Sequence, residues 1–249
     1  MRTQMSKLLP TLALAAVIAL PALAQRARTQ NGFASDIQTV PVMGNTPGAG
    51  GSRFQTFVAL LNPTATAISI EATLYDPNGT PQQATIALAA GEQKTYQNFL
   101  DEVFHYTGGG AVTFRAPGQR FLVDAEVWTS GGVRYGTSIP AIEIAPSGAP
   151  SFSTGISVDS ATRTNIGCSN QSDAANAVRA TIYDASGTMV LGTVNLMLAP
   201  RAWSQAPVSA VVTNGFVRFE PTGAAVCYAV VVNNTTHDGR FVAATEYTP

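Results

Sequence analysis

The chain has 249 residues, 12% of them charged, and its 14 lysines and arginines nearly balance its 15 aspartates and glutamates. A nucleic-acid-binding protein needs a surplus of basic residues to neutralise phosphates, so this balance argues against a nucleic-acid partner. A disordered chain combines few apolar residues with a high net charge, whereas here 45% of residues are hydrophobic and the net charge is −1. We therefore expect a folded β protein rich in Thr, Val, Ala and Gly.

Residues 1–24 have the pattern of a secretory signal peptide. Arg2 and Lys7 supply positive charge, an apolar stretch follows over Leu8–Leu20, and Ala22-Leu23-Ala24 forms a cleavage site of small residues. The apolar stretch is short for a membrane span of about 20 residues. We predict a bacterial exported protein that is periplasmic, at the cell surface or extracellular, with a mature form that does not span a membrane.

Short runs rich in Val, Ile, Thr and aromatic residues, separated by Gly, Pro, Asn and Asp, predict strands along the remainder of the chain. In the first half these are Phe54–Leu61, Ile68–Tyr75, Gln83–Leu88, Gln93–Gln97, Ala111–Arg115, Phe121–Trp128 and Val133–Ile139, with a short helical turn over Phe99–His105. In the second half they are Thr164–Ser169, Ala177–Tyr183, Met189–Leu198, Phe216–Phe219, Ala225–Val232 and Phe241–Tyr247. About seven short strands per hundred residues are typical of an immunoglobulin-like antiparallel β-sandwich.

The two halves are copies of one unit. When residues 55–80 are shifted by 108 onto residues 163–188, nine of 26 positions are identical, including Asn62 with Asn170 and Asp76 with Asp184. A fixed internal period indicates repeated structure. We predict a signal peptide over 1–24, an N-terminal segment over 25–34, and β-sandwich repeats over 35–145 and 146–249, so the fold class is all-β.

The turn after the second predicted strand of each copy has the same chemistry. Residues 75–79 are Tyr-Asp-Pro-Asn-Gly and residues 183–187 are Tyr-Asp-Ala-Ser-Gly. The aspartate side chain caps such a turn, and the glycine takes the position that needs positive φ. Each turn offers a single carboxylate, whereas a calcium site usually needs more than one, so no metal is expected there.

A set of turn and strand motifs carries a family resemblance. These are Val40-Pro41-Val42, residues 48–52, Asn62-Pro63, residues 74–79, residues 135–141 and residues 163–167. With them the chain resembles the tandem immunoglobulin-like β-sandwich repeats of bacterial secreted and cell-surface proteins. The resemblance implies the fold and a non-catalytic role, and it names no ligand.

No catalytic or metal constellation emerges from the sequence. His105 and His237 fall at unrelated points of the repeat, and no nucleophile elbow or phosphate-binding loop is present. We therefore predict no catalytic residues, no metal and no cofactor.

One strand carries a candidate binding face. Asp124, Glu126 and Trp128 alternate along it and so point to the same side, while Val123 and Ala125 point inward. Two carboxylates near a tryptophan suit sugar binding or glycoside hydrolysis, and a solvated strand face is the plainer interpretation.

Cys168 and Cys227 are the two cysteines, both in the second copy, at positions taken by Leu60 and Val123 in the first. Export favours a disulfide, and we expect it to cross between the two sheets, closing a loop of roughly 60 residues worth about 4 kcal/mol. Two buried free thiols are the alternative.

These patterns favour a secreted, non-catalytic structural or interaction protein of the adhesion type, with a protein or glycan partner at the cell surface. A carbohydrate-binding module is the alternative, and an extracellular glycoside hydrolase is a third. Exposed strand edges would also allow oligomers by strand pairing.

Overall fold

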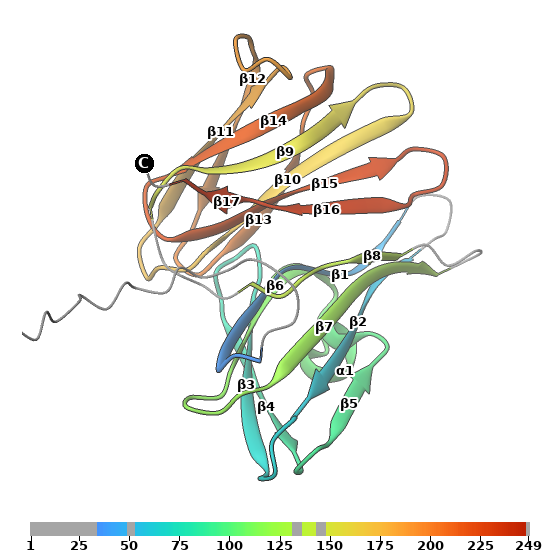
Figure 1. The fold of residues 1–249 in the computed structure, drawn as a ribbon, viewed down its shortest axis with the longest axis vertical. Coiled ribbons are helices and arrows are strands. Elements are labelled where there is room, and N and C mark those ends of the chain that lie inside the picture. Colours follow the sequence, from blue (N-terminus) through green and yellow to red (C-terminus); the bar gives the residue numbers. More distant parts are fainter. Residues whose placement is uncertain (1–33, 49–52, 131–135, 143–147, 248–249) are drawn as a thin grey trace, which may run out of the picture.

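The computed structural model describes residues 34–48, 53–130, 136–142 and 148–247. In that part of the chain almost every element is a strand, all pairings are antiparallel, and the strands form two sandwiches stacked on one another (Figure 1). The predicted signal peptide, residues 1–24, lies outside the described residues. No helix within the described ranges is long and apolar enough to cross a membrane.

The first sandwich is one sheet folded over into two layers. Its order is β4-β3-β6-β1-β2-β7-β8, with β5 also paired to β2. β1 joins the layers, because it pairs with β6 from Ile37 to Asn45, with a register shift between Val40 and Met43, and its last residues Thr46 and Pro47 pair with β2. The elements are β1 (Ile37–Pro47), β2 (Arg53–Leu61), β3 (Ile68–Tyr75), β4 (Gln82–Leu88), β5 (Gln93–Tyr96), α1 (Phe99–Phe104), β6 (Gly108–Arg115), β7 (Leu122–Ser130) and β8 (Gly136–Ser138).

The second sandwich has two separate sheets. One has the order β13-β10-β15-β16 and the other β12-β11-β14-β9-β17. The strands are β9 (Ser151–Val158), β10 (Thr162–Asn170), β11 (Asn176–Tyr183), β12 (Val190–Leu198), β13 (Trp203–Pro207), β14 (Val212–Pro221), β15 (Ala225–Asn233), β16 (Gly239–Ala243) and β17 (Thr245–Glu246).

Strand alternation builds each core. Strand β3 buries every second side chain against the opposite layer of the sandwich: Ile68, Ile70, Ala72 and Leu74. Ser69 and Glu71, which lie between them, are exposed. The predicted helical turn is confirmed as α1, which inserts Phe99 and Leu100 into the first core. Phe99 lies 5.1 Å from Tyr96 and 5.3 Å from Phe114, measured between ring centroids, so α1 closes one end of that sandwich.

Most predicted strands are confirmed, and the differences are strands that were not predicted and shifted strand ends. Three strands were not predicted: β1 and β9, the first strand of each sandwich, and β13. β1 contains Pro41 and Gly44, which weaken a strand pattern, and β9 is rich in Ser and Gly. The last predicted strand divides at Ala244, because β16 belongs to one layer and β17 pairs with β9 in the other.

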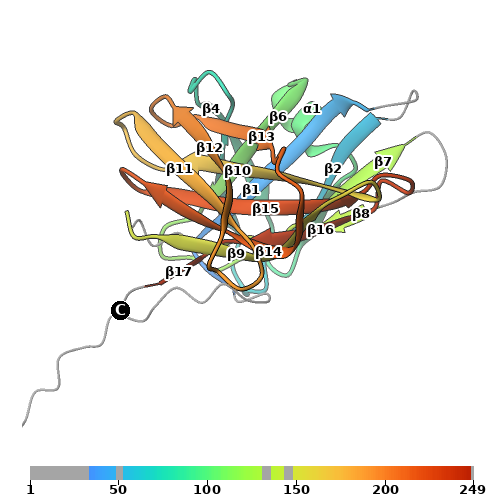
Figure 2. The same cartoon turned by 90° about the horizontal axis from the view of Figure 1, so that it is seen from above.

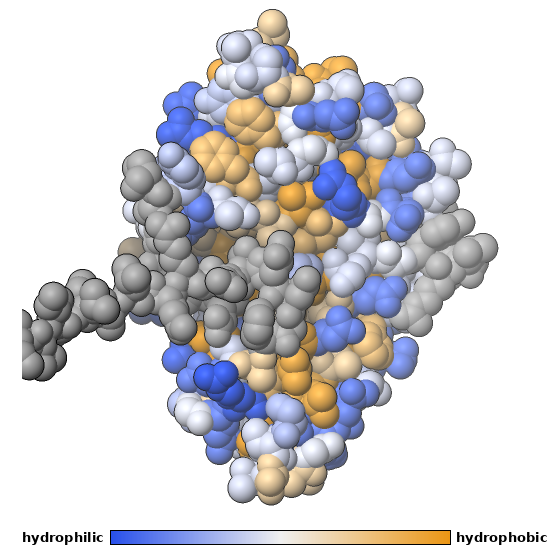
Figure 3. Space-filling view, in the orientation of Figure 1, coloured by the Kyte–Doolittle hydropathy of each residue, from blue (hydrophilic) through white to orange (hydrophobic). Residues whose placement is uncertain are grey.

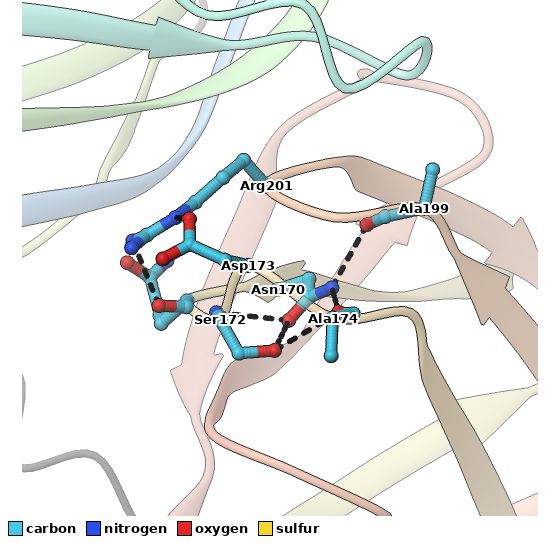
Figure 4. Close-up of polar contacts among 7 residues, drawn as sticks. Asn170, Ser172, Asp173, Ala174, Ala199 and Arg201 are labelled. Atoms are coloured by element: carbon cyan, nitrogen blue, oxygen red, sulfur yellow. Dashed lines mark hydrogen bonds and ion pairs between the residues drawn. The ribbon is translucent and has the colours of Figure 1, made fainter.

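The same asparagine network supports one loop in each sandwich. Asn62 donates from Nδ2 to the carbonyls of Thr66 and Ala89, both at 2.7 Å, and its Oδ1 accepts from the backbone N–H and the hydroxyl of Thr64. Asn170 makes the equivalent contacts to Ala174, Ala199 and Ser172 (Figure 4). Beside this network Arg201 pairs with Asp173 at 2.7 Å.

The predicted aspartate turns also match. The N–H of Asn78 donates to Asp76 Oδ1 at 2.9 Å, and the N–H of Met189 donates to Asp184 Oδ1 at 2.9 Å. The glycine that ends each turn has positive φ, 71° at Gly79 and 73° at Gly187, where a Cβ would be strained.

Candidate functional site

The two cysteines form a disulfide, as predicted, but its placement differs from the prediction. Cys168 on β10 and Cys227 on β15 are direct partners in neighbouring strands, with Cα atoms 4.1 Å apart. The bond therefore lies within one sheet and does not cross between sheets. Both side chains face the core, so the inward direction was correct. The first sandwich pairs Leu60 with Val123 at the equivalent place.

The sheet that holds the disulfide turns its outer face to the first sandwich. Figure 2 shows β10 and β15 lying across the strands of the first sandwich. Tyr228 is at the centre of this face and is fully buried. Its Oη accepts a hydrogen bond from Trp203 Nε1 at 3.2 Å and donates one to Gln205 Oε1 at 2.9 Å. Its ring stacks on Phe241 at 5.3 Å, and burial raises the pKa of the Tyr228 phenol.

The first sandwich meets this sheet with the end at which β3 finishes and β6 begins. The backbone N–H of Trp203 donates to the carbonyl of Asp76 at 3.0 Å, which joins the two sandwiches directly. The Trp203 ring lies against Gly109, where a Cβ would come within 2.9 Å of it. Gly79 approaches the second sandwich more closely still, since a Cβ there would lie 2.5 Å from the carbonyl oxygen of Pro200. The repeated turn thus serves as a contact point in the first copy.

Asp124, Glu126 and Trp128 lie on one face of β7, as predicted, and Ala125 between them is buried. Because Leu60–Val123 and Cys168–Cys227 are equivalent pairs, the three residues occupy the positions of Tyr228, Val230 and Val232. The three residues therefore lie on the sheet face of the first sandwich that is equivalent to the face with which the second sandwich packs against the first. In the first sandwich Asp124 is exposed, and Glu126 and Trp128 are partly exposed.

A second aromatic ring stands on this face. Phe57 on β2 is the direct strand partner of Glu126, and Gln55 is the partner of Trp128, so Phe57 and Trp128 are diagonal neighbours. The Trp128 indole Nε1 donates to the carbonyl of Gln97 at 3.3 Å. We call Gln55, Phe57, Asp124, Glu126 and Trp128 the outer face of the first sandwich. Sequence reasoning missed Phe57, although its alternation with the buried Thr56 and Val58 was a usable signal.

A cavity of about 440 Å³ lies where the two sandwiches meet. The first sandwich lines it with the ends of β1, β2 and β7 and with β8, and the second lines it with the outer face of β10, β13 and β15. Arg163 and Asn165 on β10 are polar residues of the lining, and His237 lines it from the loop before β16. Ligand sites occur preferentially at such junctions between domains.

Both histidines lie in loops. His105 follows α1, is exposed and has φ 51°, and His237 has φ 62° in the loop between β15 and β16. Among the described residues no group of three His, Cys, Asp or Glu side chains could hold a metal ion.

Comparison with known proteins gives no family for this chain. No family model matches, and no curated protein matches. Two solved structures with partial similarity are a Bacteroides uniformis beta-glucuronidase 2 covalently bound to cyclophellitol-6-carboxylate aziridine and a Bacteroides uniformis beta-glucuronidase. Each is 11% identical, with 79% of this chain and 26% of that chain covered and TM-scores of 0.18 and 0.17. The chain thus spans about a quarter of their length, and at these TM-scores the similarity supports no argument on function.

Proposed function

We propose that this chain is an exported, non-catalytic interaction protein of the adhesion type, built from tandem immunoglobulin-like repeats, and that its outer face of the first sandwich binds a partner. The export part rests on the pattern of residues 1–24 and on the Cys168–Cys227 disulfide, since such bonds persist mainly in oxidising compartments outside the cytosol. The interaction part rests on the duplication.

The observation that carries the proposal is the difference between two equivalent sheet faces. In the second sandwich this face packs against the first sandwich of the same chain, and Tyr228 at its centre is fully buried. In the first sandwich the same face carries Phe57 and Trp128 among Gln55, Asp124 and Glu126, and its side chains are partly or fully exposed. Aromatic residues in a polar surround are typical of transient interfaces, whereas permanent interfaces are more apolar.

The rest of the visible surface gives weaker evidence for a binding site. Figure 3 shows hydrophilic and hydrophobic residues interspersed over both sandwiches in the view of Figure 1. The most exposed large apolar side chain among the described residues is Met197 at 76%, on the edge strand β12. Single exposed apolar residues are normal on protein surfaces.

The experiment is site-specific photocrosslinking on intact cells of the source bacterium. A photoreactive amino acid at Phe57 should capture one defined partner, and capture should fall when Glu126→Ala is added. The same amino acid at Arg179, which is exposed on β11 of the second sandwich, should capture nothing above background. Equal labelling from both positions, or no adduct from Phe57, would remove the proposal.

Carbohydrate binding is the second candidate, favoured by the position of the Trp128 indole on the sheet beside two carboxylates and an amide. A glycan array should show binding that Trp128→Ala abolishes and that Met197→Ala, a matched loss of an exposed apolar side chain, leaves intact. Hydrolysis of a bound glycan that Asp124→Asn and Glu126→Gln abolish would instead identify a glycoside hydrolase and overturn the non-catalytic proposal. The carboxylate pair would then act as the acid and base of that reaction.

A further inference from the structure

The cavity between the sandwiches has an apolar wall and a charged edge. Met43, Phe54 and Ile139 line it from the first sandwich, and Trp203, Val230 and Val232 line it from the second. Met43, Ile139, Trp203 and Val232 are otherwise buried. Its volume of about 440 Å³ lies within the range of pockets that enclose small molecules.

The charge in this cavity is positive. Arg163 lines it from β10, and its Nη1 donates to Asn234 Oδ1 at 3.0 Å, while no carboxylate pairs with it among the described residues. No Asp or Glu of the described chain lines the cavity. The nearest acidic residue in sequence to His237 is Asp238, which is exposed and accepts from the N–H of Gly239. A partly buried guanidinium with spare donors favours a carboxylate, which it can bind through two hydrogen bonds.

The fold itself does not require these polar groups. Arg163 pairs with Val232, and the equivalent of Arg163 in the first sandwich is Gln55, paired with Trp128. Asn165 likewise corresponds to Phe57. The first sandwich builds the two equivalent strands without Arg or Asn at these positions. Arg163 and Asn165 are therefore not needed to form the sheet, and we attribute them to the cavity.

We propose that this cavity binds a small molecule with an apolar body and one carboxylate. Arg163 pairs with the carboxylate, the Asn165 amide donates to it from the same strand face, and the body lies against Met43, Phe54 and Val230. This site is distinct from the outer face of the first sandwich, so it goes beyond the proposed interaction function.

Calorimetric titration of the full chain with decanoate, and with decan-1-ol as the neutral analogue, tests the proposal. Decanoate should bind at one site at least 10-fold more tightly than decan-1-ol, since a charge-assisted hydrogen bond contributes about that much. Arg163→Gln, which copies Gln55, should weaken decanoate binding about 10-fold and leave decan-1-ol unchanged. Arg163→Lys should retain most of the preference for the anion.

Two further variants separate the cavity from the rest of the surface. Val230→Phe fills the cavity and should abolish binding of both probes, with the thermal midpoint confirming a folded protein. Arg179→Gln removes an exposed arginine of β11 and should leave the binding of decanoate and of decan-1-ol unchanged. The proposal is overturned if decanoate shows no saturable binding, if Arg163→Gln binds it as tightly as the unaltered chain, or if Val230→Phe still binds it. Loss of crosslinking from Phe57 would leave these results untouched, so the two proposals fail separately.

Discussion

Asn62 and Asn170, 108 positions apart, make the same set of side-chain hydrogen bonds, each spanning two backbone carbonyls and one Ser or Thr residue. Both side chains are fully buried. An amide is needed here because it offers two donors and an acceptor from one planar group. The network fixes the loop after β2 and the loop after β10 in the same shape.

Replacing Asn170 by alanine should lower the free energy of unfolding by about 3 kcal/mol, because two carbonyls and one N–H lose their partners in a buried site. Asn170→Asp keeps the size and the acceptor but loses both donors, so it should be no more stable than the alanine variant. Asn62→Ala should have a similar effect in the first sandwich. Denaturant unfolding followed by circular dichroism measures all three, and a loss below 1 kcal/mol would show that water replaces the network.

Reducing the Cys168–Cys227 bond should destabilise the second sandwich by about 4 kcal/mol, the loop-closure value for a separation of this length. The Cys168→Leu/Cys227→Val variant installs the pair found at Leu60 and Val123. It should be about 2 kcal/mol more stable than the double alanine variant, because it refills the buried site. Calorimetry with and without reductant gives these values, and equal stability of the two variants would contradict the packing argument.

Tyr228 should make the protein sensitive to alkali. Burial raises the pKa of its phenol above the ordinary value of 10.0, so the phenol stays neutral in the folded state at a pH where the unfolded chain ionises. The stabilisation is therefore complete below pH 10 and is lost as the pH rises beyond it. The thermal midpoint should therefore decrease as the pH is raised above 10. Tyr228→Phe should make this decrease less steep. Absorbance titration of tyrosinate should show one phenol fewer among the late-ionising groups in this variant.

Gly167→Ala should loosen the stacking of the sandwiches. A Cβ at Gly167 would lie 2.3 Å from Tyr228 Oη, so the ring must move away from Trp203 and Gln205, at a cost of about 2 kcal/mol. The equivalent residue Ala59 is tolerated because its strand partner is Asp124, which is exposed. Gly148→Ala is the control, since its Cβ would meet only Gly223 Cα at 4.0 Å. Similar thermal midpoints for the two variants would contradict this account.

Local sequence patterns predicted most strands, the α1 turn, the aspartate turns and the disulfide partners. They failed at β1, where Pro41 interrupts the pattern and the chain passes from one layer to the other. They also misplaced the disulfide between sheets, because an inward direction is shared by strands of both layers. Only the register, with Cys168 opposite Cys227, distinguishes a neighbour from a facing strand.

Local patterns along the chain were enough to predict an all-β fold with two similar halves, since strand alternation, turn residues and the 108-residue shift do not depend on contacts between distant residues. They also placed Asp124, Glu126 and Trp128 on one strand face. Which outer strand faces are covered could not be predicted in this way. Alternation separates the two sides of a strand, but whether an outer side meets water or another sheet depends on contacts between distant residues. Tyr228, Arg163 and Asn165 lie on such a side, and stacking places the first at a buried contact and the other two in a cavity.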